Sequence, residues 1–594
     1  MSTLLWVLTG ILVYSVGAVA LDRRGLLPSY FKVSGPLLTV HTKRGRDFLE
    51  QLSKPKRVWR ALANVGVGIA LVTMVGTFLL LIVQSVSILN SPPTETVLQS
   101  PRNALVIPGV NEFLPLSVAP EIIIGLLVGL VVHEGGHGLL CRVENIDINS
   151  MGVVLFALIP IGAFVEPDEE SADEVDRGAQ TRMFAAGVLN NLIITVLVFA
   201  LLFGPVGSAI AVAPGAGVGG VFPGSTAEDA DIEQGDRIVA VDGQPVESSE
   251  ELETIIAESD AETLSVELAD GRTVTVERAA YVAAISPDSP FAGDEGIADQ
   301  DLITAVDGTP VSTERDIKTA AENESVVELT YTDAETGEEA TVEGPLGVLA
   351  TAADDGPLAA AGAPTDEGMV ITAIAGERIV DFDDLTKTLE TTEPGEPVEI
   401  VAFVDGERTT YDVELQSHPD EEDRAFIGIL GSLGTSGIEI NSFGVMPYPA
   451  DNFLSILTGS AGDNLAATLL LLIILPFASI IDPSMGFNFA GFVDANAAFY
   501  EVVGPLAGLG ETGVFLLANI LFWTGWINFN LALFNCIPAF PLDGGRILRS
   551  ATESVVSRLP VDSKPQLTRA ITTSIGLLML VSLVLMIFGP QLLS

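Results

Sequence analysis

Three ionisable residues, His133, Glu134 and His137, interrupt an otherwise apolar run, GLLVGLVVHEGGHGLLC, at residues 125–141. Residues four apart lie on one face of an α-helix, so the imidazoles of His133 and His137 can point at a common ion. Glu134 lies on the adjoining face, where it can reach a water on that ion instead of the ion itself. The H-E-x-x-H spacing therefore predicts the metal site of a zinc hydrolase.

The alternative is a pair of core histidines satisfied by hydrogen bonds. Ionisable side chains are costly within a membrane-spanning helix and mark function there. The chain has only four histidines, and two of them lie in this run. Gly135 and Gly136 weaken a helix, which indicates that another part of the molecule approaches closely. This context favours the metal site.

Two histidines leave a catalytic zinc ion short of a third protein ligand. The best candidate is Asp543, in the segment NFNLALFNCIPAFPLDGGRIL at residues 528–548. Asp543 ends an apolar run, follows two helix-breaking prolines and precedes Gly544 and Gly545. Irregular backbone at membrane depth is tolerated only where protein or a cavity surrounds it. The irregular backbone around Asp543 is therefore typical of a bent segment that carries a ligand inside the protein.

Composition divides the chain into two kinds of sequence. Of 594 residues 48% are hydrophobic, yet the formal net charge is -50. Acidic residues crowd into residues 225–425, and apolar runs fill the remainder. A spanning helix needs roughly 20 apolar residues, and six runs approach that length, at residues 4–21, 61–89, 122–141, 183–203, 513–534 and 571–588. We therefore expect a polytopic α-helical membrane protein, with about six spanning helices plus re-entrant segments and one acidic insert.

Basic residues predict the orientation of these helices. Arg23 and Arg24 follow the first apolar run instead of preceding it, which favours an anchor over a cleaved signal peptide. The next loop is rich in Lys and Arg, which places it in the cytoplasm. Counting onward through the spans puts the acidic insert outside the cell.

One apolar run, at residues 465–481, does not fit a simple crossing. If it spanned the membrane, the Asp543 segment would run the wrong way, because basic residues mark the end of that segment as cytoplasmic. The run has only 17 residues and contains Pro476. We expect a re-entrant or surface segment.

The insert contains three related stretches, at residues 235–256, 299–321 and 366–390. Each has an alternating strand, a Gly turn, a short second strand and a helix, which indicates related small modules. They resemble PDZ domains attached to proteases, most clearly at residues 218–243, whereas the third has Ala375 where the others have a turn Asp. The resemblance implies α+β domains that receive extended peptide termini by strand addition. The alternative is a spacer or size filter around the membrane part.

Lysine is almost absent from the insert, where Lys318 and Lys387 stand alone. Excess acidic surface keeps proteins soluble at high salt, so we expect a salt-loving host, a halophilic archaeon. Nucleic acid is not an expected partner, because phosphate requires a basic face. Cys141 and Cys536 are the only cysteines, and a disulfide framework is therefore not expected.

Together, the H-E-G-G-H run, the NCIPAFPLDGG segment at residues 535–545 and AGVLNN at residues 186–191 resemble the site-2 protease family of intramembrane zinc metalloproteases. The resemblance implies one catalytic Zn²⁺, with ligands and base drawn from both halves of the chain. The implied metal ligands are His133, His137 and Asp543, and the implied general base is Glu134.

The same resemblance extends to substrate handling. It implies that Asn535 and Asn191 position the substrate or a neighbouring strand. It also implies that the substrate unwinds and pairs with a strand embedded in the membrane, for which the β-rich residues 150–167 are the candidate. The alternative for residues 150–167 is an ordinary interfacial loop.

These features predict seven regions. They are N-terminal transmembrane helices with a basic loop (1–117), core helices with the HEGGH motif and a membrane hairpin (118–205), three PDZ-like domains (206–280, 281–350 and 351–430), a membrane-associated or re-entrant region (431–510), and a core helix with the LDGG motif and a C-terminal transmembrane helix (511–594).

The expected function is that of a zinc-dependent endopeptidase in the cell membrane, which cleaves transmembrane segments of protein substrates in regulated intramembrane proteolysis. The alternative is a catalytically inactive membrane scaffold or receptor that binds peptides through its PDZ-like domains. A transporter is disfavoured, because no two halves of the chain show matching broken helices.

Overall fold

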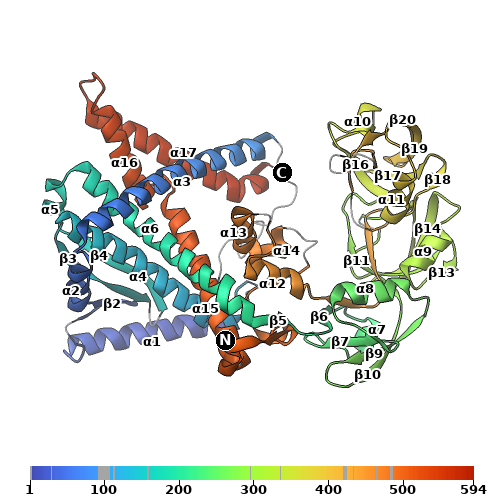
Figure 1. The fold of residues 1–594 in the computed structure, drawn as a ribbon, viewed down its shortest axis with the longest axis horizontal. Coiled ribbons are helices and arrows are strands. Elements are labelled where there is room, and N and C mark those ends of the chain that lie inside the picture. Colours follow the sequence, from blue (N-terminus) through green and yellow to red (C-terminus); the bar gives the residue numbers. More distant parts are fainter. Residues whose placement is uncertain are drawn as a thin grey trace. The chain divides into compact units, whose positions relative to one another are not determined.

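The computed structural model describes residues 3–28, 30–90, 107–111, 114–156, 159–293, 296–334, 336–418, 424–431, 434–462, 464–481 and 486–593. The chain divides into two compact units. The first comprises Met1–Val212 and Asp451–Ser594, and the second comprises Ala213–Ala450 (Figure 1). The second unit contains the acidic insert predicted from the sequence.

Long apolar helices build the first unit. The six predicted apolar runs lie in α1 (Thr3–Arg23), α3 (Lys56–Asn90), α4 (Ala119–Glu144), α6 (Arg177–Leu201), α15 (Gly510–Asn535) and α17 (Lys564–Leu593). Among the described residues, five helices are long and apolar enough to cross a membrane, and they are those listed apart from α1. Shorter helices in this unit are α2 (Lys43–Leu52), α5 (Glu169–Glu174), α12 (Ala450–Thr458) and α16 (Asp543–Val556).

Helices α4, α6 and α15 pack together through small residues. A Cβ atom added to Gly125 of α4 would lie 3.0 Å from the carbonyl oxygen of Trp523 on α15, and one added to Gly136 would lie 2.6 Å from that of Ala186 on α6. Lipid tails are as apolar as leucine, so helices associate in membranes largely by such close backbone packing. The close approach expected from the sequence is found at Gly136, whereas Gly135 has no atom within 4 Å of an added Cβ.

Two distant segments join in one antiparallel sheet of the first unit. Its order is β1 (Phe31–Ser34), β2 (Leu37–His41), β3 (Ile148–Phe156) and β4 (Ile159–Pro167). The described residues of the candidate membrane-embedded strand, 150–156 and 159–167, therefore lie in two paired strands instead of a loop. Strand β4 is at the edge of the sheet and packs against α4.

The apolar run at residues 465–481 is broken. It forms α13 (Leu465–Ile474), a short 3₁₀ turn (Leu475–Phe477) and α14 (Ala478–Ile481). At about 1.5 Å per residue, α13 is about 15 Å long, half of the ~30 Å hydrocarbon core. Residues after it pack on α15, where the backbone N–H of Phe492 donates to Oδ1 of Asn519 over 2.8 Å. The geometry agrees with a segment that does not span the membrane as one helix.

The second unit contains three β-sheets of similar topology. The first runs β10-β9-β7-β6-β25, the second β15-β14-β12-β11-β24 and the third β20-β19-β17-β16-β23. Their main strands are β6 (Ala216–Val221), β7 (Arg237–Val241), β9 (Thr263–Leu268), β10 (Thr273–Glu277), β11 (Ala280–Ile285), β12 (Leu302–Val306), β14 (Val326–Thr332), β15 (Glu339–Pro345), β16 (Val348–Ala352), β17 (Met369–Ile374), β19 (Pro397–Val404) and β20 (Glu407–Glu414). One helix follows the short second strand of each module, at α8 (Ser249–Glu258), α9 (Glu314–Ala320) and α11 (Phe382–Glu390).

The last strand of each sheet comes from the returning chain, in reverse order. Strand β23 (Ile429–Gly431) completes the third sheet, β24 (Ile438–Asn441) the second and β25 (Val445–Pro447) the first. The third module is thus inserted into the second, and the second into the first. The predicted region 431–510 contains β24 and β25, which belong to the second and first sheets. The predicted contiguous domains, with boundaries at 280 and 350, therefore leave out part of these sheets.

A shared turn supports the internal repeat. Asp242, Asp307 and Ala375 have φ values of 50°, 48° and 52°, and each precedes a glycine with positive φ. Two successive positive φ angles form the type I′ turn that suits tight hairpins. The carboxylates of Asp242 and Asp307 also accept backbone N–H bonds from Ser265 and Glu328 of the neighbouring strand, at 2.8 and 2.9 Å. Ala375 keeps the turn without this bond.

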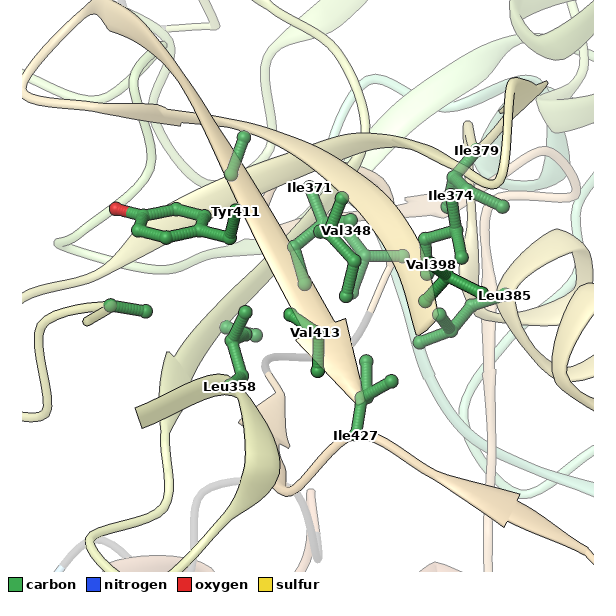
Figure 2. Close-up of a cluster of buried hydrophobic side chains, with 14 of the residues drawn as sticks. Val348, Leu358, Ile371, Ile374, Ile379, Leu385, Val398, Tyr411, Val413 and Ile427 are labelled. Carbon is green, nitrogen blue, oxygen red and sulfur yellow. The ribbon is translucent and has the colours of Figure 1, made fainter. Parts of the chain in front are cut away.

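Each module has a separate apolar core. In the third, Val348, Ile371, Val398 and Val413 from four strands meet Leu385 of α11 (Figure 2). The other two cores use corresponding strands and helices. Alternation is clear in β9, whose residues are exposed and buried in turn, as the period-two pattern of a half-buried strand requires.

Candidate active site

The three candidate metal ligands come from segments about 400 residues apart along the chain. His133 and His137 lie one turn apart on α4, and Asp543 is the first residue of α16. Oδ2 of Asp543 lies 3.1 Å from Nε2 of His133 and 3.0 Å from Nε2 of His137. The two Nε2 atoms are 3.2 Å apart. The structure therefore brings all three ligating atoms to one point.

The hydrogen bonds around the cluster leave lone pairs on its nitrogen and oxygen atoms that point toward its centre. Nδ1 of His137 lies 2.8 Å from the carbonyl oxygen of Met183, which can only accept a hydrogen bond. In the neutral imidazole Nδ1 therefore carries the hydrogen, and Nε2 presents a lone pair to the cluster. Oδ2 of Asp543 is buried and has no hydrogen-bond partner among the described residues. Electron-rich atoms gathered in this way require a cation, and two imidazoles with one carboxylate suit Zn²⁺.

Helix α6 closes the cluster from another side. A Cβ atom added to Gly187 would lie 2.7 Å from Cε1 of His133 and 2.7 Å from Nε2 of His137, so the site has room only for glycine. Gly187 was not among the predicted site residues. The G-x-x-x-N spacing of Gly187 and Asn191 was the pattern that could have indicated it.

Asn191 lies behind His133 and has no exposed surface. Its Nδ2 atom is 3.2 Å from Nδ1 of His133, and its Oδ1 atom has no partner among the described residues. Turning the amide by 180° would bring Oδ1 to the imidazole, where it could accept the Nδ1 proton and leave Nε2 free to ligate. The side chain is thus packed behind the imidazole of His133 and does not face open space.

The side chain of Glu134, which is part of α4, reaches the edge strand β4. Its Oε2 accepts a 3.0 Å hydrogen bond from the backbone N–H of Val165 on β4. Among the described residues, the group of atoms that could hold one metal ion contains His133, His137 and Asp543 but not Glu134. The carboxylate is therefore beside the cluster and fixed against a strand.

Asn535 is not part of this cluster. Its Nδ2 atom donates to the carbonyl oxygen of Leu531 over 2.9 Å, within its own helix. The residue is half-buried at the C-terminal end of α15. No hydrogen bond between described residues joins it to the ligands.

A buried ion-pair cluster holds the end of the ligand helix. Glu144, the last residue of α4, accepts hydrogen bonds from Arg60 of α3 at 2.9 Å and from Arg182 of α6 at 2.7 Å. Because Arg182 precedes Met183, whose carbonyl meets His137, these bonds set α6 against α4 near the site. No local sequence pattern indicates this cluster, because its three members lie on three separate helices.

The fold and the cluster define a class: a membrane protein with a His-Glu-x-x-His motif whose two histidines lie beside an aspartate from a distant helix, in a group that could hold a metal ion. The sequence model of peptidase family M50 matches residues 121–583. The chain belongs to that family, and the resemblance to site-2 proteases noted in the sequence is confirmed.

Curated relatives match part of the chain. It is 36% identical over 159 residues to an uncharacterized protein of Methanocaldococcus jannaschii, and the aligned region covers 26% of this chain and 40% of that protein. It is 25% identical over 211 residues to the zinc metalloprotease RasP of Shouchella clausii, which covers 34% of this chain and 42% of RasP. The chain thus spans less than half the length of these two relatives.

Proposed function

We propose that the protein is a zinc-dependent intramembrane endopeptidase that cleaves transmembrane segments of other membrane proteins. The observation that carries this proposal is the convergence of two imidazole nitrogens and one carboxylate oxygen beside Glu134, within apolar helices. Structural zinc sites use four protein ligands, whereas catalytic sites use three and leave one position open. The three ligating residues among the described residues favour the catalytic kind of site.

His133, His137 and Asp543 would hold the zinc ion. When bound, zinc supplies Lewis-acid activation of a water and of the peptide carbonyl. Glu134 takes the proton from the attacking water and passes it to the leaving amide nitrogen. The hydrogen bond to the N–H of Val165 holds the carboxylate in place before substrate arrives, and such prior positioning lowers the barrier.

Strand β4 is the proposed docking edge for substrate. A transmembrane helix uses its peptide groups in internal hydrogen bonds, so it must unwind before it can be cut. An edge strand presents unpaired backbone groups that an extended segment can pair with. Ile159 and Ile161 on β4 are 46% and 48% exposed, and these apolar side chains suit a substrate drawn from lipid. Pairing there would bring a peptide bond past Val165 and Glu134.

We further propose that Asn191 keeps the tautomer and orientation of His133 instead of contacting substrate. Hydrogen-bond partners behind a metal-ligating histidine fix its ring and raise its basicity. The support is the complete burial of Asn191 and its 3.2 Å contact with Nδ1 of His133.

The three modules of the second unit are proposed to be PDZ-like and extracytoplasmic. Their returning strands, β23, β24 and β25, end the three sheets, so each could accept an extended chain terminus by strand addition. The same modules could instead exclude large proteins from the membrane site. Competition of a soluble C-terminal peptide with substrate distinguishes peptide binding from a size filter.

The decisive test of the active site is Glu134→Gln in the full chain, purified in high salt and assayed on a model transmembrane substrate. Loss of a general base lowers rates by about 10²- to 10⁴-fold, and bound zinc should remain. Glu50→Gln is the matched control, because it makes the same chemical change at an exposed residue of α2, outside strand β4 and the cluster. Equal cleavage by wild type and Glu134→Gln would remove the mechanism, whereas zinc binding without any cleavage would favour the scaffold alternative.

A further inference from the structure

A cavity lies outside the metal cluster. Its volume is about 940 Å³, and its walls are α16, α17, part of α3, the first residue of α6 and the loop that joins α15 to α16. Helices α16 and α17 pack against each other (Figure 1). None of the candidate metal ligands nor Glu134 lines this cavity, so the proposed cleavage reaction does not account for it.

One end of the cavity is basic. A single acid, Glu553, lines it together with four basic residues, Arg177, Arg549, Lys564 and Arg569. The whole chain has the opposite balance, with 28 Lys and Arg against 78 Asp and Glu. Glu553 is already engaged, at 3.1 Å from Arg549 and 3.5 Å from Arg177.

Arg569 is the basic group that remains available. Lys564 is engaged by the carbonyl oxygen of Ser557 at 2.7 Å. The guanidinium of Arg569 has no ion pair or side-chain hydrogen bond among the described residues, and the residue is exposed to the cavity end. A guanidinium of this kind binds phosphate oxygens in a bidentate manner.

The other end of the cavity is apolar. Leu577, Leu580 and Leu583 of α17 line it, with Leu81 of α3 opposite. Threonine hydroxyls lie between the two ends. Along the helix, Leu583 lies about 21 Å beyond Arg569 at 1.5 Å per residue. One leaflet with its head groups measures roughly 20–22 Å, half of a 40–45 Å bilayer.

We propose that this cavity binds an anionic phospholipid, with the phosphate at Arg569 and a hydrocarbon chain along the leucines. Basic pockets between transmembrane helices on the cytoplasmic side recognise anionic head groups, and the basic end here is the end that the positive-inside rule assigns to the cytoplasm. An acidic peptide could match the charge but not the leucine-lined end. A zwitterionic lipid could match the leucines without using the excess positive charge.

A lipid in this position would touch the loop that leads to the candidate metal ligand Asp543. Residues 537–540 and 542, which precede Asp543, line the cavity. The loop is already close to α16, because a Cβ on Gly544 would lie 2.3 Å from the carbonyl oxygen of Ile537. The lipid would therefore fill the open side of a loop whose other side is packed.

Native mass spectrometry of the full chain tests this proposal, with dioleoylphosphatidylglycerol as the anionic probe and dioleoylphosphatidylcholine as the zwitterionic one. Wild type should retain the anionic lipid preferentially. Arg569→Gln should weaken its binding about fivefold, the effect of removing one basic group near a lipid surface. Arg57→Gln is the matched control, because Arg57 is exposed on α3 and does not line the cavity; this variant should bind like wild type.

A second variant tests the apolar end without changing charge. Apart from its own helix, the only described atom within 4 Å of a Cβ on Gly576 is the carbonyl oxygen of Pro538, at 4.0 Å, so the side chain of Gly576→Leu should fit and occupy part of the cavity. Leucine also favours the helix over glycine, which protects folding. This variant should reduce lipid retention to the level of phosphatidylcholine.

Three outcomes would overturn the proposal. Equal retention of the two lipids by wild type would remove the anionic specificity. Unchanged binding in both Arg569→Gln and Gly576→Leu would place the lipid elsewhere on the protein. If inorganic phosphate displaced the lipid and bound equally well to Gly576→Leu, the cavity would be a simple anion site.

Discussion

The two units of the molecule differ in which side chains cover their surfaces and in where their polar residues lie. In the membrane unit, apolar residues face outward, as Val72 and Leu80 on α3 do with 75% and 66% of their surface exposed, while His133 and Asn191 lie inside. In the third module of the insert, Ile371 is fully buried and acids cover the outside. The buried polar groups proposed to carry the function lie in the first unit, whereas in the second unit the buried apolar groups stabilise the fold.

The first prediction concerns the buried apolar core of the insert, where we expect the largest effect on stability. Ile371→Ala removes a fully buried side chain and should lower the free energy of unfolding of the third module by about 2–5 kcal/mol. Val72→Ala makes a similar truncation at a surface that faces lipid and should have a small effect. Amide hydrogen exchange in β17 measures the first, and equal effects of the two substitutions would contradict the distinction.

Gly187→Ala tests the proposed functional role of the buried polar groups in the membrane unit. The added methyl group would lie 2.7 Å from both imidazoles, so the ligands must shift. A displacement of about 1 Å can reduce a rate by about 10²-fold. Gly68→Ala is the matched control, because an added Cβ there has no atom within 4 Å. Initial rates of substrate cleavage measure both, and normal activity in Gly187→Ala would mean that the site tolerates a wider approach of α6.

Asn191→Ala should have a smaller effect, on metal affinity. Loss of a group behind a ligating histidine typically lowers metal affinity by about 10- to 100-fold. Asn535→Ala should leave zinc affinity unchanged, because the amide of Asn535 bonds within its own helix. Competition with a chelator measures the zinc dissociation constants. Equal affinities of Asn191→Ala and wild type would return Asn191 to a role in substrate positioning.

The sequence predicted what depends on local pattern. Apolar length located the helices, and the spacing of His133 and His137 with the irregular segment at Asp543 indicated the metal cluster. Turn residues and alternation indicated three related modules. Each of these signals arises within a short stretch, where the chain's own geometry determines which side chains share a face.

Features that depend on distant pairing were not predictable. Glu144, Arg60 and Arg182 form one ion-pair cluster only because three helices meet. The returning strands have three or four residues each, too few to show a period. Strand β25 pairs with β6, more than 200 residues earlier, and no local pattern in either strand specifies that partner.

The nested strands also determine the order in which the insert can fold during synthesis. The first module has most of its strands once Glu277 has emerged, but its sheet is completed by Val445–Pro447. At 5–20 residues per second, translation takes about 10–30 s to cover that interval. The third module, which is closed by β23, can complete its sheet first, then the second and finally the first. The module that emerges first is thus the last to finish, and until then its edge beside β6 remains open to chaperones or to incorrect strand pairing.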